Sequence, residues 1–147
     1  MVAWQRRSSK CCCRLLSYHR QMISLAFFAL LLQAPAAPPT KPSILLTKDL
    51  PGIAGKEGTM LTVEYAPGAS APAHAHHAST FVYVLEGHVV MQVKGGKETT
   101  LGPGETFYEN PDDIHTVGRN ASKTESAKIL VFMVKEKGAP VSTPAPR

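Results

Sequence analysis

The chain is poor in cysteine, and all of its cysteine lies near the start. Cys11, Cys12 and Cys13 are consecutive, and no other cysteine occurs in the 147 residues. The rest of the chain therefore lacks the thiols needed for disulfides, cysteine nucleophiles or iron–sulfur ligation. Three consecutive cysteines also lack the spacers typical of zinc-ribbon ligands.

The sequence also lacks the concentrated positive charge of a nucleic-acid-binding domain. Its formal net charge is +5, but five of the sixteen Lys and Arg residues lie within the first twenty positions. From residue 37 onward the chain carries eleven basic and eleven acidic residues. A neutral domain without a basic stripe excludes nucleic acid as a partner. The length suits one domain, and 44% hydrophobic with 18% charged residues is ordinary for a globular protein.

Residues 1–36 have the pattern of a secretory signal peptide. A basic stretch precedes the apolar run 22–32, which leads to Ala34-Pro35-Ala36, a small-residue cleavage motif. The apolar run is shorter than the roughly 20 residues of a membrane-spanning helix. We expect cleavage near Ala37, no stable membrane anchor afterwards, and a secreted or periplasmic protein. An uncleaved signal anchor is the alternative, and Met22 is a second candidate start.

The remainder of the chain predicts an all-β domain. Short runs rich in β-branched or aromatic residues alternate with Gly or Pro clusters, a pattern that favours an antiparallel sandwich or barrel. We expect a Pro-rich link over 37–42, the barrel over 43–137 and a flexible Pro-rich tail over 138–147. Pairing through an edge strand at 43–48 would give a homodimer. The expected strands are 43–48, 59–66, 80–86, 88–94, 98–101, 105–108, 114–119 and 127–135.

The chemistry of the domain is concentrated in its histidines. His74 and His76 are two residues apart, so on an extended strand they point to one face, which Thr80 would share. With His115, from a strand expected across the barrel, they would form a three-nitrogen set for a divalent transition metal. On spacing alone, a surface histidine-rich turn that binds nothing specific is an equal interpretation.

Two motifs in this region resemble those of the cupin family. The first runs from Gly68 through His74-Ala75-His76 and Thr80 to Gly87, and fits the family pattern except that Thr80 replaces a glutamate. The second, looser motif runs from Gly104 through Pro111 to His115 and Asn120, with Asp112 at a position where the family has glycine. Asp112 tolerates the turn geometry that glycine provides.

The resemblance implies a single jelly-roll barrel with His74, His76 and His115 as ligands of iron, manganese, nickel, zinc or copper. In the usual family site the missing glutamate is a fourth ligand, so Thr80 is expected to hydrogen-bond groups around the metal instead. Phe107 is a candidate pocket residue. Glu109 is interpreted as a solvated loop residue, with a replacement carboxylate as the alternative. His77 and His88 are expected to be exposed.

Two function classes stay open on this basis. One is a metal-dependent dioxygenase acting on a small chelating substrate, and the other is a non-catalytic barrel that binds a small ligand or a metal. No residue is identified from the sequence as the general acid or base. The sequon Asn120-Ala121-Ser122 matters only in a eukaryotic secretory pathway.

Overall fold

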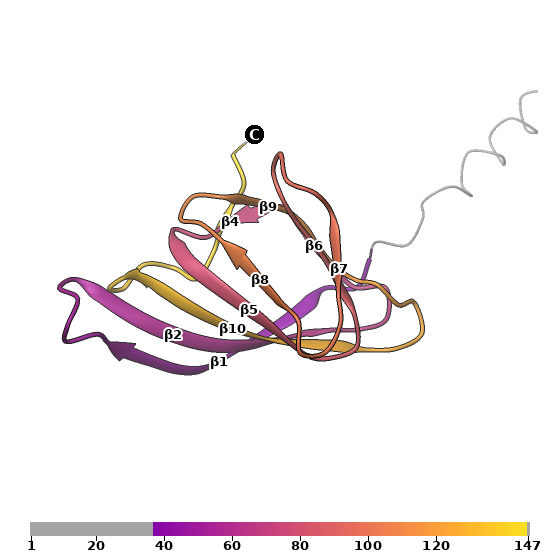
Figure 1. Ribbon diagram of the computed structural model, residues 1–147, viewed down its shortest axis with the longest axis horizontal. Helices are drawn as coiled ribbons and strands as arrows, with labels where there is room; N and C mark the ends of the chain where they lie inside the picture. The colour runs from indigo at the N-terminus through magenta and orange to yellow at the C-terminus, as the bar shows by residue number, and fades with distance from the viewer. Residues whose placement is uncertain (1–36, 147) are drawn as a thin grey trace, which may run out of the picture. The chain divides into compact units, whose positions relative to one another are not determined.

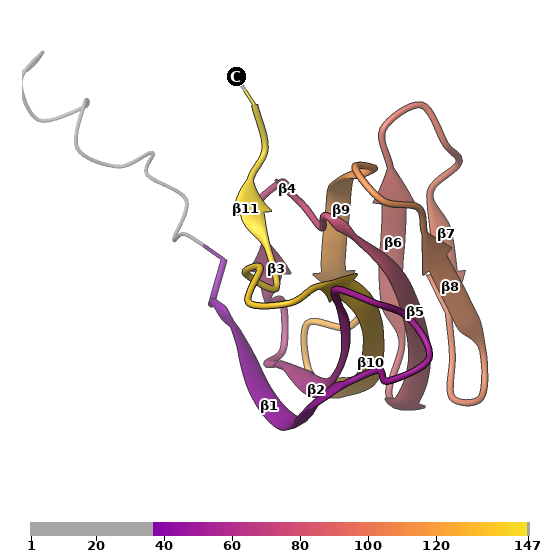
Figure 2. The same cartoon turned by 90° about the vertical axis from the view of Figure 1, so that its left-hand side faces the viewer.

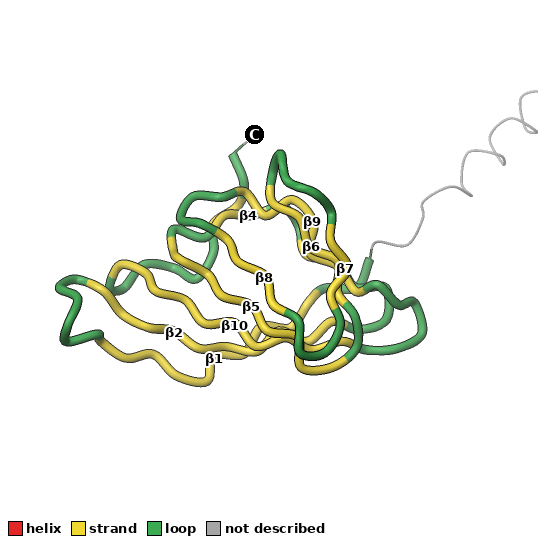
Figure 3. The backbone as a smooth tube through the Cα atoms, viewed as in Figure 1, coloured by secondary structure: helices red, strands yellow, loops and turns green. Residues whose placement is uncertain are grey.

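The computed structural model describes residues 37–146, which form strands and connecting turns with no helix in that range (Figures 1 and 3). The predicted signal peptide, residues 1–36 with the three cysteines, lies outside the described residues. Within that range, no helix is long and apolar enough to cross a membrane. The strands are β1 (Thr40–Asp49), β2 (Lys56–Tyr65), β3 (Ser70–Ala71), β4 (His74–Ala75), β5 (Ala78–Glu86), β6 (Val89–Val93), β7 (Thr99–Leu101), β8 (Thr106–Glu109), β9 (Ile114–Asn120), β10 (Ala127–Glu136) and β11 (Thr143–Pro144).

The strands form two antiparallel sheets that together make the predicted jelly-roll barrel (Figure 2). One sheet has the order β1-β2-β10-β5-β8, and the other has the order β11-β4-β9-β6-β7 with β3 also paired to β9. Every strand pairing in the described part of the chain is antiparallel. The all-β prediction is confirmed.

Side-chain alternation along the strands builds the core between the sheets. In β5, buried residues alternate with more exposed ones from Ala78 to Val84. Because successive residues of a strand point to opposite faces, one face of the strand is interior and the other is outside. The core is correspondingly made of inward side chains from both sheets, and includes Leu61, Tyr65, Val82, Val84, Val89, Met91, Ile129, Val131 and Met133.

Gly87 and Asp112 lie in turns and both have a positive φ, which glycine and aspartate tolerate better than most residues. Gly87 has φ 67°, and a Cβ there would lie 2.4 Å from the carbonyl oxygen of Ser126, so only glycine fits. Asp112 has φ 69°, and among the described residues it is the one residue other than glycine with a positive φ. Asp112 therefore occupies the left-handed geometry expected where the family has glycine.

Asn120 closes the loop between β9 and β10 from inside the protein. Its side-chain nitrogen donates to the backbone oxygens of Tyr65, Ala66 and Glu125 at 3.2, 3.0 and 2.8 Å. Its side-chain oxygen accepts from the backbone nitrogen of Ser122 at 2.8 Å. The residue is 5% exposed, so its amide is a buried structural clamp.

The C-terminal segment differs from the flexible tail expected over 138–147. Thr143–Pro144 forms β11, which pairs with β4, and Val141 packs against the core. The docked residues are small or β-branched and occupy alternate positions, whereas Pro140 and Pro144 are exposed. The high proline content of this segment is typical of a linker, but prolines at exposed positions are also compatible with an edge strand such as β11.

Candidate functional site

Strands β4 and β9 bring the three candidate histidines together. His74 pairs with His115 in the register of these neighbouring strands, so His115 comes from the adjacent strand and not from across the barrel as expected. His76 follows β4 directly and returns to the same interior face. One side-chain nitrogen from each histidine lies within 4.8 Å of the others.

Backbone carbonyls set the protonation of two of these imidazoles. The Nδ1 atom of His74 lies 2.8 Å from the oxygen of Pro72, and that of His76 lies 2.5 Å from the oxygen of Val141. A carbonyl oxygen only accepts, so each Nδ1 carries the proton and donates it. Each Nε2 then keeps a free electron pair, and these two Nε2 atoms are 3.1 Å apart.

Burial keeps the imidazoles of His76 and His115 in the neutral form that binds metals. It is the main cause of a pKa lowered to about 4 at His115, with the neighbouring His74 contributing. Burial also lowers the pKa of His76. Neutral imidazole is the ligand form, so the pair of buried histidines is ready to coordinate at neutral pH.

Glu109 faces the histidines from the opposite sheet, which corrects its interpretation as a solvated loop residue. It is 2% exposed at the end of β8, where it is the register partner of Thr80 on β5. Its carboxylate oxygens lie 3.8 Å from Nε2 of His76 and 3.7 Å from Nδ1 of His115. Burial, with some contribution from Asp113, raises the pKa of Glu109 to about 7. A carboxyl group therefore reaches the site from the strand next to the one that carries Thr80.

The donor atoms of this cluster fit a bound transition metal. Oε2 of Glu109 and Nε2 of His115 are the two buried side-chain polar atoms in residues 37–146 that have no hydrogen-bond partner. Such atoms are unfavourable unless another group satisfies them. Two nitrogens each about 2.1 Å from one ion lie roughly 3.0–3.4 Å apart in octahedral or tetrahedral geometry, which matches the two facing Nε2 atoms.

A mostly apolar cavity of about 340 Å³ opens onto the three histidines. Glu109 and Thr80 lie in its wall, together with Tyr65 and aliphatic residues from β2, β5 and β10. Burial and the charge of Glu109 raise the pKa of Tyr65 to about 12, so its phenol is a hydrogen-bond donor and not a base at neutral pH. Tyr65 was missed from the sequence because its position on β2 has no motif.

Of the other residues singled out from the sequence, Thr80 and Phe107 lie beside the cluster, whereas His77 and His88 are exposed. Thr80 is fully buried in the cavity wall, where its hydroxyl is 3.5 Å from the oxygen of Ala78. The ring of Phe107 lies beside that of His115 with centroids 6.4 Å apart, but Phe107 does not line the cavity in which it was expected. His77 is exposed and paired with Asp112, and His88 is exposed on the surface.

Comparisons with solved structures agree with this architecture. A protein from Klebsiella pneumoniae subsp. pneumoniae MGH 78578 with a double-stranded β-helix domain is 20% identical, with a TM-score of 0.58 over 78% of this chain and 90% of its own. A cupin-like protein from Thermotoga maritima MSB8 is 18% identical, with a TM-score of 0.57 over 72% and 75%.

The DMSP lyase DddQ from Ruegeria pomeroyi DSS-3 is 19% identical, with a TM-score of 0.53 over 60% of this chain. The match covers 43% of the lyase, less than half of its length. No curated protein sequence matches the chain significantly. The family model described as "Cupin domain" matches residues 61–133, a segment that contains His74, His76 and His115. The match and the two-sheet fold agree, and the chain belongs to the cupin superfamily.

Proposed function

We propose that the protein binds one divalent transition metal through His74, His76 and His115, with Glu109 as the carboxylate of the site. The observation that carries this proposal is the 3.1 Å distance between the Nε2 atoms of His74 and His76, whose protons the backbone carbonyls assign to Nδ1. With no proton between them, their electron pairs repel unless a cation lies there. The hydrogen bonds from both Nδ1 atoms to backbone carbonyls hold this arrangement in place.

We further propose that the site acts as a dioxygenase on a small, largely apolar substrate that chelates the metal, such as a diol, a diketone or a carboxylate. A metal held by three histidines would supply Lewis acidity and open positions for substrate and O₂. The aliphatic cavity wall excludes water from the substrate. Tyr65 can donate a hydrogen bond to a substrate oxygen.

Glu109 supplies the acid–base group that the sequence did not identify. Its buried carboxyl lies beside the histidines, where it can accept a proton from a substrate hydroxyl. The buried carboxyl also lowers the positive charge that three neutral histidines alone would leave on a bound metal.

The proposal is tested by metal analysis and O₂ uptake on the same preparations. Elemental analysis should find about one ion per chain, and the His74→Ala/His76→Ala/His115→Ala triple variant should lose it. The matched control is His77→Ala, which alters an exposed histidine of the same segment and should keep the metal. Oxygen consumption should appear with at least one of catechols, 1,3-diketones or 2-oxo acids.

The possible results separate the two function classes. Metal in the wild type without O₂ uptake on any substrate class would favour the non-catalytic metal-binding or ligand-binding barrel. Equal metal content in the wild type and the triple variant would show that the three histidines are structural.

A further inference from the structure

The last part of the chain runs along the barrel as an extended segment, here called the C-terminal strap (residues 139–145). Its residues alternate between partly buried and exposed: Ala139, Val141, Thr143 and Ala145 are partly buried, and the residues between them are exposed. This period of two is the pattern of a strand with one face against the protein. The strap is therefore docked along its whole length.

Each inward residue of the strap meets a specific partner. Nζ of Lys135 donates to the oxygen of Ala139 at 2.5 Å. The oxygen of Val141 accepts from Nδ1 of His76, also at 2.5 Å. Farther along, Thr143 pairs with Ala75 of β4, and the nitrogen of Ala145 donates to the oxygen of Ala73 at 3.2 Å. Figure 2 shows the strap, in yellow, running beside β4.

The strap thus contacts both metal-ligating residues of the first motif. Strand β4 is only two residues long and carries His74, and β11 is its partner on the side opposite β9. The carbonyl of Val141 fixes the proton of His76 on Nδ1, which leaves Nε2 free for a metal. Without this acceptor, the imidazole of His76 could rotate or place its proton on Nε2.

The strap also closes the cavity. Val141, Ser142, Thr143 and Pro144 all line it, and Val141 packs against the hydrophobic core. Undocking would remove one wall of the cavity and expose the histidines to water at the same time.

We propose that the C-terminal strap is a positioning element of the metal site, and that its docking is coupled to metal binding. The proposal rests on the proposed metal-binding function. Because coupling between two equilibria is reciprocal, a strap that raises metal affinity by a given factor is itself held more tightly, by the same factor, when metal is bound.

The first test compares Zn²⁺ affinity, measured by competition with a chelator, in three forms of the protein. A chain that ends at Lys137 lacks the strap and should bind Zn²⁺ about 10- to 100-fold more weakly than the full chain, the range typical of losing a partner that orients a ligand. The matched control ends at Ala145, keeps every strap contact described above, and should bind like the full chain.

The outcomes separate this proposal from the proposed function. If the full chain binds no Zn²⁺, the metal-binding function fails. If the chain ending at Lys137 binds Zn²⁺ as tightly as the full chain, the strap proposal is overturned and the metal-binding function stands.

A second test needs no truncation and so avoids a variant that fails to fold. Hydrogen exchange of the strap amides in the full chain should slow about 10- to 100-fold when Zn²⁺ saturates the site, and the turn at Gly95 and Gly96 should be unaffected. Long-range ¹H–¹⁵N NMR should find the proton of His76 on Nδ1 in the metal-free protein. Equal exchange of the strap with and without Zn²⁺, or a proton on Nε2, would contradict the coupling.

Discussion

At the scale of single residues, Glu109 combines a role in the site with a cost in stability. Its carboxyl has a pKa of about 7 in the folded protein against 4.5 as its ordinary value. Between these pH values the folded state binds more protons than the unfolded state, so the stability of the metal-free protein falls as pH rises through this window. The pKa of His115, lowered to about 4, has the opposite effect on stability. Its contribution makes the folded protein less stable as pH falls below about 6.5.

The variant Glu109→Gln isolates the contribution of the Glu109 carboxyl to the pH dependence of stability, because the contribution of His115 is the same in wild type and variant. We expect metal-free Glu109→Gln to be more stable than wild type at pH 8, by on the order of 3 kcal/mol. Near pH 4.5 the difference should vanish, since the wild-type carboxyl is then neutral. Urea unfolding at both pH values measures this, and a pH-independent difference would contradict it. The same variant should bind metal more weakly.

At the scale of strands, the site has a carboxylate on β8 where the family motif places it on β5. Thr80 and Glu109 are register partners with both side chains inside, so the two strands offer equivalent places for the group. Adding a glutamate at position 80 alone would bury two carboxyls side by side, and their repulsion raises the pKa of at least one of them.

Exchanging Thr80 and Glu109 tests more directly than either single variant whether the two positions share the site. Thr80→Glu alone should lower the melting temperature of the metal-free protein and weaken Zn²⁺ binding. The double variant Thr80→Glu/Glu109→Thr moves the carboxyl back to β5 and should recover much of the Zn²⁺ affinity. A non-zero coupling energy in this double-mutant cycle is expected for neighbouring residues of one site. Additive effects would show that the two positions do not share the site.

The strands explain what the sequence could and could not predict. All eight expected strands occur, because side-chain alternation and turn residues are local signals. The two-residue spacing of His74 and His76 likewise predicted that their side chains point to the same face. Strands β3, β4 and β11 are two residues each, too short for any periodic signal. The inward direction of Glu109 and the pairing of β4 with β9 depend on register between distant segments, which one sequence does not contain.

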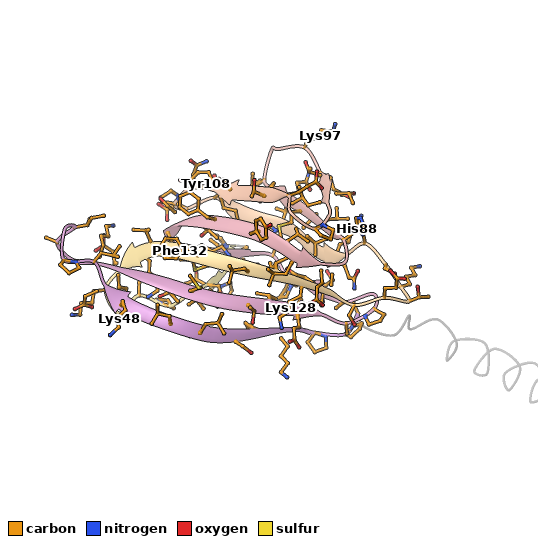
Figure 4. The ribbon with its side chains drawn as sticks, turned by 60° about the horizontal axis from the view of Figure 1, so that its bottom comes forward. Lys48, His88, Lys97, Tyr108, Lys128 and Phe132 are labelled. Carbon is orange, nitrogen blue, oxygen red and sulfur yellow. The ribbon has the colours of Figure 1, made fainter. Side chains whose placement is uncertain are left out.

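At the scale of the whole molecule, one side of the barrel is unusually apolar. Leu46 of β1 is 48% exposed, and Phe81, Tyr108 and Phe132 are exposed on the same sheet. Figure 4 shows Tyr108 and Phe132 pointing outward from this sheet. Strand β1 also has an unpaired edge, since β2 is its only partner among the described strands. A second copy would cover this edge and Leu46, because antiparallel pairing of two β1 strands is compatible with a two-fold axis.

We therefore propose a homodimer through the free edge of β1. Sedimentation should give twice the mass of the monomer, and Leu46→Lys should shift the mass toward the monomer without unfolding the barrel. Lys97→Glu, at an exposed turn away from that edge, is the control and should stay dimeric. A wild-type protein that is monomeric at high micromolar concentration would contradict the proposal.

Export is the second proposal at this scale. The proposal rests on the basic stretch, the apolar run 22–32 and the small-residue motif Ala34-Pro35-Ala36 in the sequence. N-terminal sequencing of protein recovered from its native compartment should begin near Ala37, because a cleaved signal peptide leaves the strands intact. Recovery of the full-length chain from the cytosol would contradict it.

The buried side chain of Asn120 has a consequence for biosynthesis. Oligosaccharide attachment needs the amide nitrogen of a sequon, and in the folded protein this nitrogen already donates to three backbone oxygens. A sugar on Asn120 would replace those contacts with a bulky group that has no room inside. In a eukaryotic secretory pathway, folding and modification would therefore compete for the same atom. Chains that receive the glycan first would be unable to close the loop between β9 and β10.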